Sequence, residues 1–70
     1  MIELSELIEV LSHYKETDVV VFISVMNDPE PDKARERILV EWIDNGESKV
    51  DTYAYSMSQG WYVVNTGPRP

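Results

Sequence analysis

The chain has no cysteine, one histidine and only three glycines among its 70 residues. Without cysteine, neither a disulfide nor a thiolate zinc site can form. One histidine cannot build a histidine-rich metal site, and the glycines are too far apart to form a glycine-rich phosphate loop. The sequence therefore predicts a protein that holds no metal ion or other cofactor.

Basic residues are also scarce, because six lysines and arginines stand against thirteen aspartates and glutamates. The formal net charge is −7. This charge disfavours direct binding of nucleic acid, which depends on basic surface that releases counterions. It disfavours anionic membranes for the same reason. The expected partner is a basic protein surface.

The chain lacks a long apolar run as well. The longest one, from Val19 to Ile23, is far too short to cross a bilayer. The opening Met1-Ile2-Glu3-Leu4 has no basic leader of the kind that begins a signal peptide. We expect a cytoplasmic protein with a single domain over residues 1–66 and a flexible tail over residues 67–70.

Two patterns in the first part of the chain predict its first two elements. Apolar side chains recur at helical spacing, which predicts an amphipathic helix over residues 4–15 with a stripe of Leu4, Leu7, Ile8, Leu11 and Tyr14. The run from Val19 to Met26 is β-branched and aromatic with almost no alternation. It predicts a strand that is covered on both faces and lies centrally in a sheet.

The second part of the chain predicts a hairpin around Asn45-Gly46. A two-residue loop would place Trp42 opposite Lys49, whereas a four-residue loop places Asp44 opposite Lys49. The four-residue loop is favoured by these pairs, although Asn-Gly by itself favours the shorter one. A last short strand is expected over residues 61–65.

Together these elements predict an α+β fold, with one N-terminal helix packed on one face of a four-stranded antiparallel sheet. One helix cannot cover both faces. The uncovered face is expected to carry several tyrosines and a tryptophan.

Catalytic arrangements are missing from the sequence. The only histidine, His13, falls on the polar face of the expected helix, where no nucleophile is paired with it. The spacing of Glu9, His13 and Glu16 is better explained by a solvated helix face than by a metal site. The sequence therefore predicts a protein that is not an enzyme.

Carboxylates recur at regular steps in two places. Asp28, Glu30 and Asp32 would recur every ~6.2–6.6 Å in an extended segment. Glu6 and Glu9 are neighbours at about 5–6 Å on a helix face. Every second phosphate of a DNA strand advances ~6.8 Å, so these carboxylates are compatible with imitation of DNA. Maintenance of solubility is the alternative, and the sequence leaves both open.

Aromatic residues are the other candidate contact surface. Trp42, Tyr55 and Trp61 are of the residue types that dominate protein interfaces, because they bury much area with few rotatable bonds. Their alternative role is to fill the core. Strand alternation places Trp61 and Tyr62 on opposite faces of the sheet.

The segment Leu4-Ser5-Glu6-Leu7-Ile8-Glu9-Val10-Leu11, followed by Asp18-Val19-Val20-Val21, resembles the opening of small acidic phage-encoded inhibitors. In size, acidity and layout the chain is similar to the phage uracil-DNA-glycosylase inhibitor and to acidic anti-CRISPR proteins. The resemblance implies a protein that acts in the host cytoplasm and blocks a nucleic-acid-handling enzyme, often by imitating DNA. It assigns a role to no individual residue.

The sequence thus predicts a small acidic inhibitor or modulator that occupies a basic surface of another protein. Electrostatic attraction is expected from the carboxylates Glu6, Glu9, Asp28, Glu30 and Asp32, and close contact from Trp42, Tyr55 and Trp61. The second hypothesis is a homo-oligomeric structural or accessory domain, a homodimer in the simplest case, that assembles through an aromatic sheet face. The third is a small-ligand binder with a cleft beside the sheet.

Overall fold

In the computed structural model, which describes residues 2–26 and 35–68, the chain forms one helix and four strands. They are α1 (Leu4–Leu11), β1 (Val19–Met26), β2 (Arg37–Asp44), β3 (Glu47–Ser56) and β4 (Gly60–Pro68). The strands lie in the order β1-β2-β3-β4, and each is antiparallel to its neighbour. The predicted α+β fold with an N-terminal helix is confirmed.

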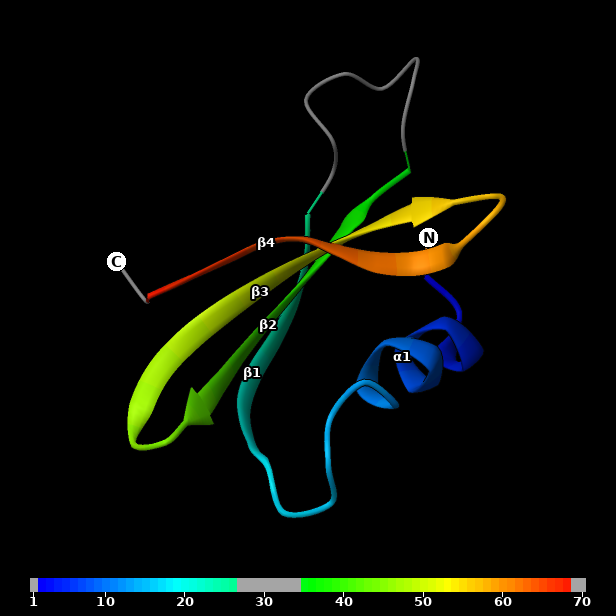
Figure 1. Ribbon diagram of the computed structural model, residues 1–70. Helices are drawn as coiled ribbons and strands as arrows, with labels where there is room; N and C mark the ends of the chain where they lie inside the picture. The colour runs from blue at the N-terminus through cyan, green and yellow to red at the C-terminus, as the bar shows by residue number, and fades with distance from the viewer. Residues whose placement is uncertain (1, 27–34, 69–70) are drawn as a thin grey trace.

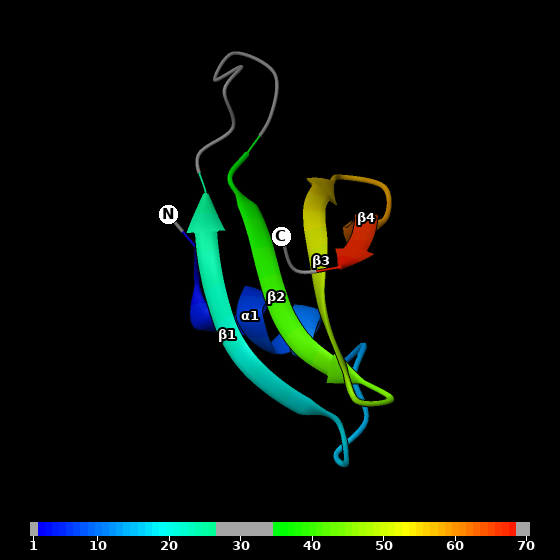
Figure 2. The ribbon, with the colours of Figure 1, turned by 90° about the vertical axis from the view of Figure 1, so that its left-hand side faces the viewer.

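The helix lies against one face of the twisted sheet (Figure 1). After a quarter turn about the vertical axis the helix lies behind the strands, so the sheet face toward the viewer carries no helix (Figure 2). We call these the helix face and the open face. No helix within residues 2–26 and 35–68 is long and apolar enough to cross a membrane.

Helix α1 begins at a capping box, in which the Glu3 N–H donates to the Glu6 carboxylate at 2.9 Å. The helix faces the sheet with a different stripe from the predicted one. Val10 is fully buried, whereas Leu4 and Ile8 are 71% and 60% exposed. The prediction for Leu4 and Ile8 is wrong because a single short helix presents only one narrow stripe to the sheet, and the stripe that packs includes Leu7 and Val10.

The β2–β3 turn contains two residues, so the prediction of a four-residue loop is wrong. Asn45 and Gly46 both have positive φ, 54° and 85°, as this tight hairpin turn requires. The register pairs Val40 with Asp51. This apolar–acidic pair is tolerated because Asp51 accepts hydrogen bonds from outside the hairpin. The expected attraction of Asp44 for Lys49 persists on a diagonal, at 2.7 Å.

Two strands differ in extent or position from the expectation. β1 lies at an edge of the sheet and most of its apolar side chains are exposed, so the predicted central position is wrong within one copy of the chain. Its apolar run lacks cover because the small helix packs elsewhere. β4 continues through Gly67 and Pro68, which pair with Val50 and Lys49. Proline is compatible with this position because an edge strand can leave its N–H side unpaired.

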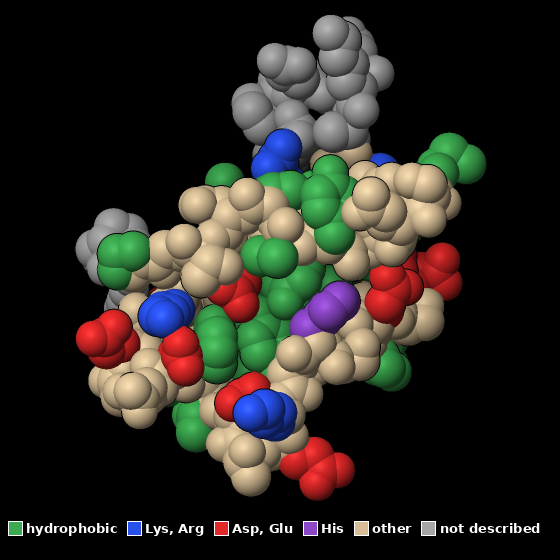
Figure 3. Space-filling view, viewed as in Figure 1, with side chains coloured by type: hydrophobic (Ala, Val, Ile, Leu, Met, Phe, Trp, Pro, Cys, Tyr) green, Lys and Arg blue, Asp and Glu red, His purple; other side chains and the backbone are tan. Residues whose placement is uncertain are grey.

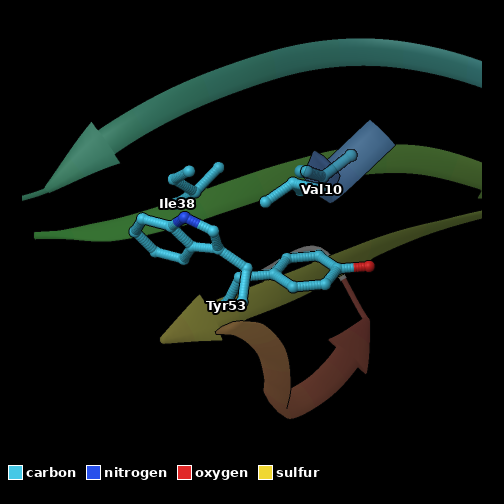
Figure 4. Close-up of a cluster of buried hydrophobic side chains, with 5 residues drawn as sticks. Val10, Ile38 and Tyr53 are labelled. Atoms are coloured by element: carbon cyan, nitrogen blue, oxygen red, sulfur yellow. The ribbon is translucent and has the colours of Figure 1, made fainter. Parts of the chain in front are cut away.

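The core lies between the helix and the sheet. Its fully or nearly fully buried apolar side chains come from α1, β2, β3 and β4: Val10, Ile38, Val40, Tyr53 and Trp61. Val10, Ile38 and Tyr53 point toward one another across the gap between the helix and the strands (Figure 4). This small core is on the helix face alone, so the open face makes no comparable contribution to folding.

Candidate functional site

The open face of the sheet contains a hollow of about 430 Å³. Its apolar lining comes from all four strands: Phe22, Leu39, Val50 and Pro68. The volume is within the range of ligand sites, about 300–1,000 Å³. Exposed apolar side chains around a concave site are typical of a surface that binds another molecule.

Polar groups are interspersed in the same hollow. Ser24, Thr52 and Asn65 contribute hydroxyl and amide groups, and Glu41 contributes a carboxylate. Hydroxyls and amides can form directional hydrogen bonds, while the carboxylate favours a cationic group. The lining therefore suits an apolar or basic side chain of a partner.

The register explains how the hollow forms. Ser24 is opposite Leu39, and Leu39 is opposite Thr52, which is opposite Asn65. These residues therefore share one face across the four strands, while their sequence neighbours point to the helix. Sequence reasoning missed this site. The alternation along residues 37–44 was the available signal, but it does not say which of the two faces the helix covers.

The three predicted aromatic contact residues lie on the helix face, not on the open face. Trp61 is 2% exposed and belongs to the core. Trp42 is half-buried and packs edge-on against Tyr14, with 5.2 Å between ring centroids. Tyr55 is 37% exposed and contacts Trp61 at 5.5 Å. The expectation of a tryptophan on the uncovered face is wrong, because Trp61 is part of the core and Trp42 packs against it.

Tyr62 is the tyrosine that points away from the helix. It is opposite Ala54, and its neighbour Trp61 is opposite Tyr55 on the other face. The prediction that Trp61 and Tyr62 separate onto opposite faces is confirmed. The open face therefore carries Tyr62 and Phe22, and not the expected group of several tyrosines and a tryptophan.

Glu6 forms contacts within the chain. Its carboxylate lies 2.7 Å from the Arg35 guanidinium, and it also accepts from the Glu3 N–H. The pKa of Glu6 is lowered to about 2, mainly by its hydrogen bond with the Arg35 guanidinium and secondly by the hydrogen bond from the Glu3 N–H. Arg35 also lies over the rings of Tyr55 and Trp61, at 4.6 and 5.4 Å from their centroids.

Glu9 has an internal partner too, since its Oε2 accepts from the backbone N–H of Trp61 at 2.9 Å. Glu6 and Glu9 therefore connect the helix to other parts of the chain, and do not form a free acidic row. The other three predicted carboxylates, Asp28, Glu30 and Asp32, lie outside the described residues. Figure 3, seen from the same direction as Figure 1, shows carboxylate side chains dispersed over the visible surface, with apolar side chains between them.

A hydrogen-bond network surrounds the buried carboxylate of Asp51. Tyr14 donates to Oδ2 at 2.6 Å and Thr66 donates to Oδ1 at 2.8 Å, while Tyr53 donates to the Tyr14 hydroxyl at 3.0 Å. The pKa of Tyr14 is raised mainly by burial and secondly by its hydrogen bond to Asp51, so its hydroxyl stays protonated at neutral pH. The network connects Tyr14, in the segment that follows the helix, to β3 and β4. It was not predicted, because its members are far apart in the sequence.

Metal ligands do not gather within the described part of the chain: no group of three His, Asp or Glu side chains there could hold an ion. Comparisons with protein-family models, with curated proteins and with solved structures found no match. The hollow on the open face is therefore the feature on which a functional proposal can be built.

Proposed function

We propose that this chain is a small protein-binding domain without catalytic activity, and that it inhibits or modulates its target by occupying a basic surface. The hollow of about 430 Å³ on the open face is the observation that carries the proposal. A helix covers the opposite face, so the open face is where a partner can reach the sheet. We place this activity in the cytoplasm, in agreement with the resemblance to phage-encoded inhibitors.

Charge supports a basic partner. A net charge of −7 on 70 residues attracts a cationic surface at distances up to about a Debye length, ~8 Å at physiological salt. Surfaces that bind nucleic acid are basic and are natural targets of this kind. Because Glu6 and Glu9 are engaged within the chain, the attraction comes from the overall charge and not from a row of helix carboxylates matched to phosphate positions.

Contacts within the hollow supply the second part of binding. Apolar side chains in the hollow suit a lysine or arginine whose methylene groups lie on Val50 and Leu39. Such a contact buries area at the centre of an interface, where binding energy concentrates. The charge then controls the rate of association, and the hollow controls the lifetime of the complex.

The test is capture from bacterial lysate with two matched variants. Asn65→Arg places a long cationic side chain in the hollow, and Gln59→Arg makes the same change at the exposed β3–β4 turn. Both change the net charge equally. We expect a protein that is retained by the parent chain and by Gln59→Arg, is lost with Asn65→Arg, and is released as salt rises.

Equal retention by the two variants would show that the hollow does not bind the target. If salt does not affect how much of the captured protein is retained, its binding surface is not a basic one. Circular dichroism of both variants checks that each is folded.

A further inference from the structure

Strand β1 is an apolar edge that one copy of the chain leaves uncovered. Within the described residues it pairs on one side only, with β2. Val19, Val21, Phe22, Val25 and Met26 are all exposed. The sequence of β1 nevertheless has the composition of a strand at the centre of a sheet, with a continuous apolar run and almost no alternation. A second sheet edge placed against β1 would make it central.

Features that protect edge strands from pairing are few in β1. Monomeric proteins commonly place charged residues or proline on an exposed edge, and Val19–Met26 contains neither. The opposite edge, β4, ends in Gly67-Pro68. One bulge interrupts β1 between Val20 and Phe22. Beyond it the five residues from Phe22 to Met26 keep a regular register with β2 and are suited to pair on their other side.

We propose that two copies of this chain form a homodimer through antiparallel pairing of their β1 strands, with the two-fold axis at Ser24. A two-fold axis makes the same patch meet itself, so one unprotected edge is sufficient for both partners. The segment from Phe22 to Met26 carries no charge, so it forces no like charges together. A basic partner would find no counter-charge on it.

The register of this dimer follows from strand pairing. Phe22 lies opposite Met26 of the second copy on the open face, and Ile23 lies opposite Val25 of the second copy on the helix face. Every pair apart from Ser24 with itself is apolar. Because the axis is perpendicular to the sheet, both open faces are on the same side. The dimer doubles the four-stranded sheet and places the two hollows next to each other, with Phe22 of each copy between them.

Two lysine substitutions test the dimer by sedimentation velocity. Val25 and Val63 are both 48% exposed and both lie on the helix face, opposite Ile38 and Tyr53, but they are on opposite edges. We expect the parent chain and Val63→Lys to be dimeric at roughly 50 µM, and Val25→Lys to dimerise at least about tenfold more weakly. A monomeric parent chain at this concentration, or equal weakening by both substitutions, would overturn the proposal.

Cross-linking tests the register independently. Because the chain has no native cysteine, only the introduced thiol can form a disulfide. Ser24→Cys places two thiols directly opposite each other, where Cβ atoms are about 4.5–5.5 Å apart and close to the spacing that a disulfide needs. We expect rapid formation of a covalent dimer under mild oxidation. Ser58→Cys at the β3–β4 turn is the control. Equal rates for the two variants would contradict the register.

Salt separates this proposal from the proposed function. Two copies of charge −7 repel each other, so added salt should strengthen the dimer, whereas it should weaken binding to a basic target. The dimer is also expected to tolerate Asn65→Arg, because Asn65 is on β4. Either proposal can therefore fail while the other stands.

Discussion

The buried carboxylate of Asp51 provides the clearest quantitative prediction. Replacing Tyr14 by phenylalanine removes the hydroxyl that donates to Asp51 at 2.6 Å and accepts from Tyr53 at 3.0 Å. A hydrogen bond to a charged group contributes about 1.5–3 kcal/mol, and a neutral one about 0.5–1.5 kcal/mol. We therefore expect Tyr14→Phe to lower the free energy of unfolding by about 2–4 kcal/mol.

This loss is large for so small a protein. A 70-residue chain with a core of five buried apolar side chains has a net stability of only a few kcal/mol. Tyr14→Phe should therefore populate unfolded chains measurably at room temperature. The apolar ring is retained, so the loss reports the hydroxyl and not the packing.

Urea unfolding followed by tryptophan fluorescence measures the effect, since Trp61 is buried in the folded state. Tyr62→Phe is the matched control, because Tyr62 is on the open face and is exposed. It should change the free energy of unfolding by less than about 0.5 kcal/mol. If Tyr14→Phe is as stable as Tyr62→Phe, the hydroxyl network around Asp51 does not stabilise the fold.

Two further predictions concern the helix contacts. Folding lowers the pKa of Glu6 from 4.5 to about 2, so the stability that Glu6 contributes is fully present above pH 4.5 and is lost as pH falls toward 2. In acid unfolding curves, Glu6→Gln should therefore reduce this loss of stability. Glu16 is exposed, and Glu16→Gln should leave the loss unchanged. Gly46 and Gly60 both have positive φ, but only at Gly60 would a Cβ lie near another side chain, 2.7 Å from Glu9 Oε2. Gly46→Ala should lower the free energy of unfolding by about 1 kcal/mol, and Gly60→Ala should lower it more. Equal losses in urea unfolding would show that the contact with Glu9 has no effect.

Local patterns in the sequence were sufficient for the kind and order of the elements. Helical spacing over the first residues, β-branched composition in 19–26 and the Asn45-Gly46 turn each depend on neighbours within a few positions. The two-residue loop was also present in this local information, because Asn-Gly accepts positive φ at both positions. Cross-strand pairing favoured the wrong loop, because the side chains that bind Asp51 are Tyr14 and Thr66, and neither lies in the hairpin.

The candidate site was less predictable. A stripe of carboxylates or aromatic rings in a sequence does not show which of them other parts of the chain will contact. Glu6 meets Arg35, and Trp61 enters the core, through contacts between residues far apart in the sequence. The hollow on the open face depends on four strands at once and has no local signature.

The sequence by itself determined the acidic charge, the lack of cysteine, and the succession of a helix and four strands, because these follow from composition and short-range geometry. Only the tertiary structure decided which sheet face the helix covers, and therefore that the tryptophans are internal and β1 is an open edge. The physical reason is that one short helix can cover only part of a four-stranded sheet, and the part that it covers is selected by the packing of the whole chain.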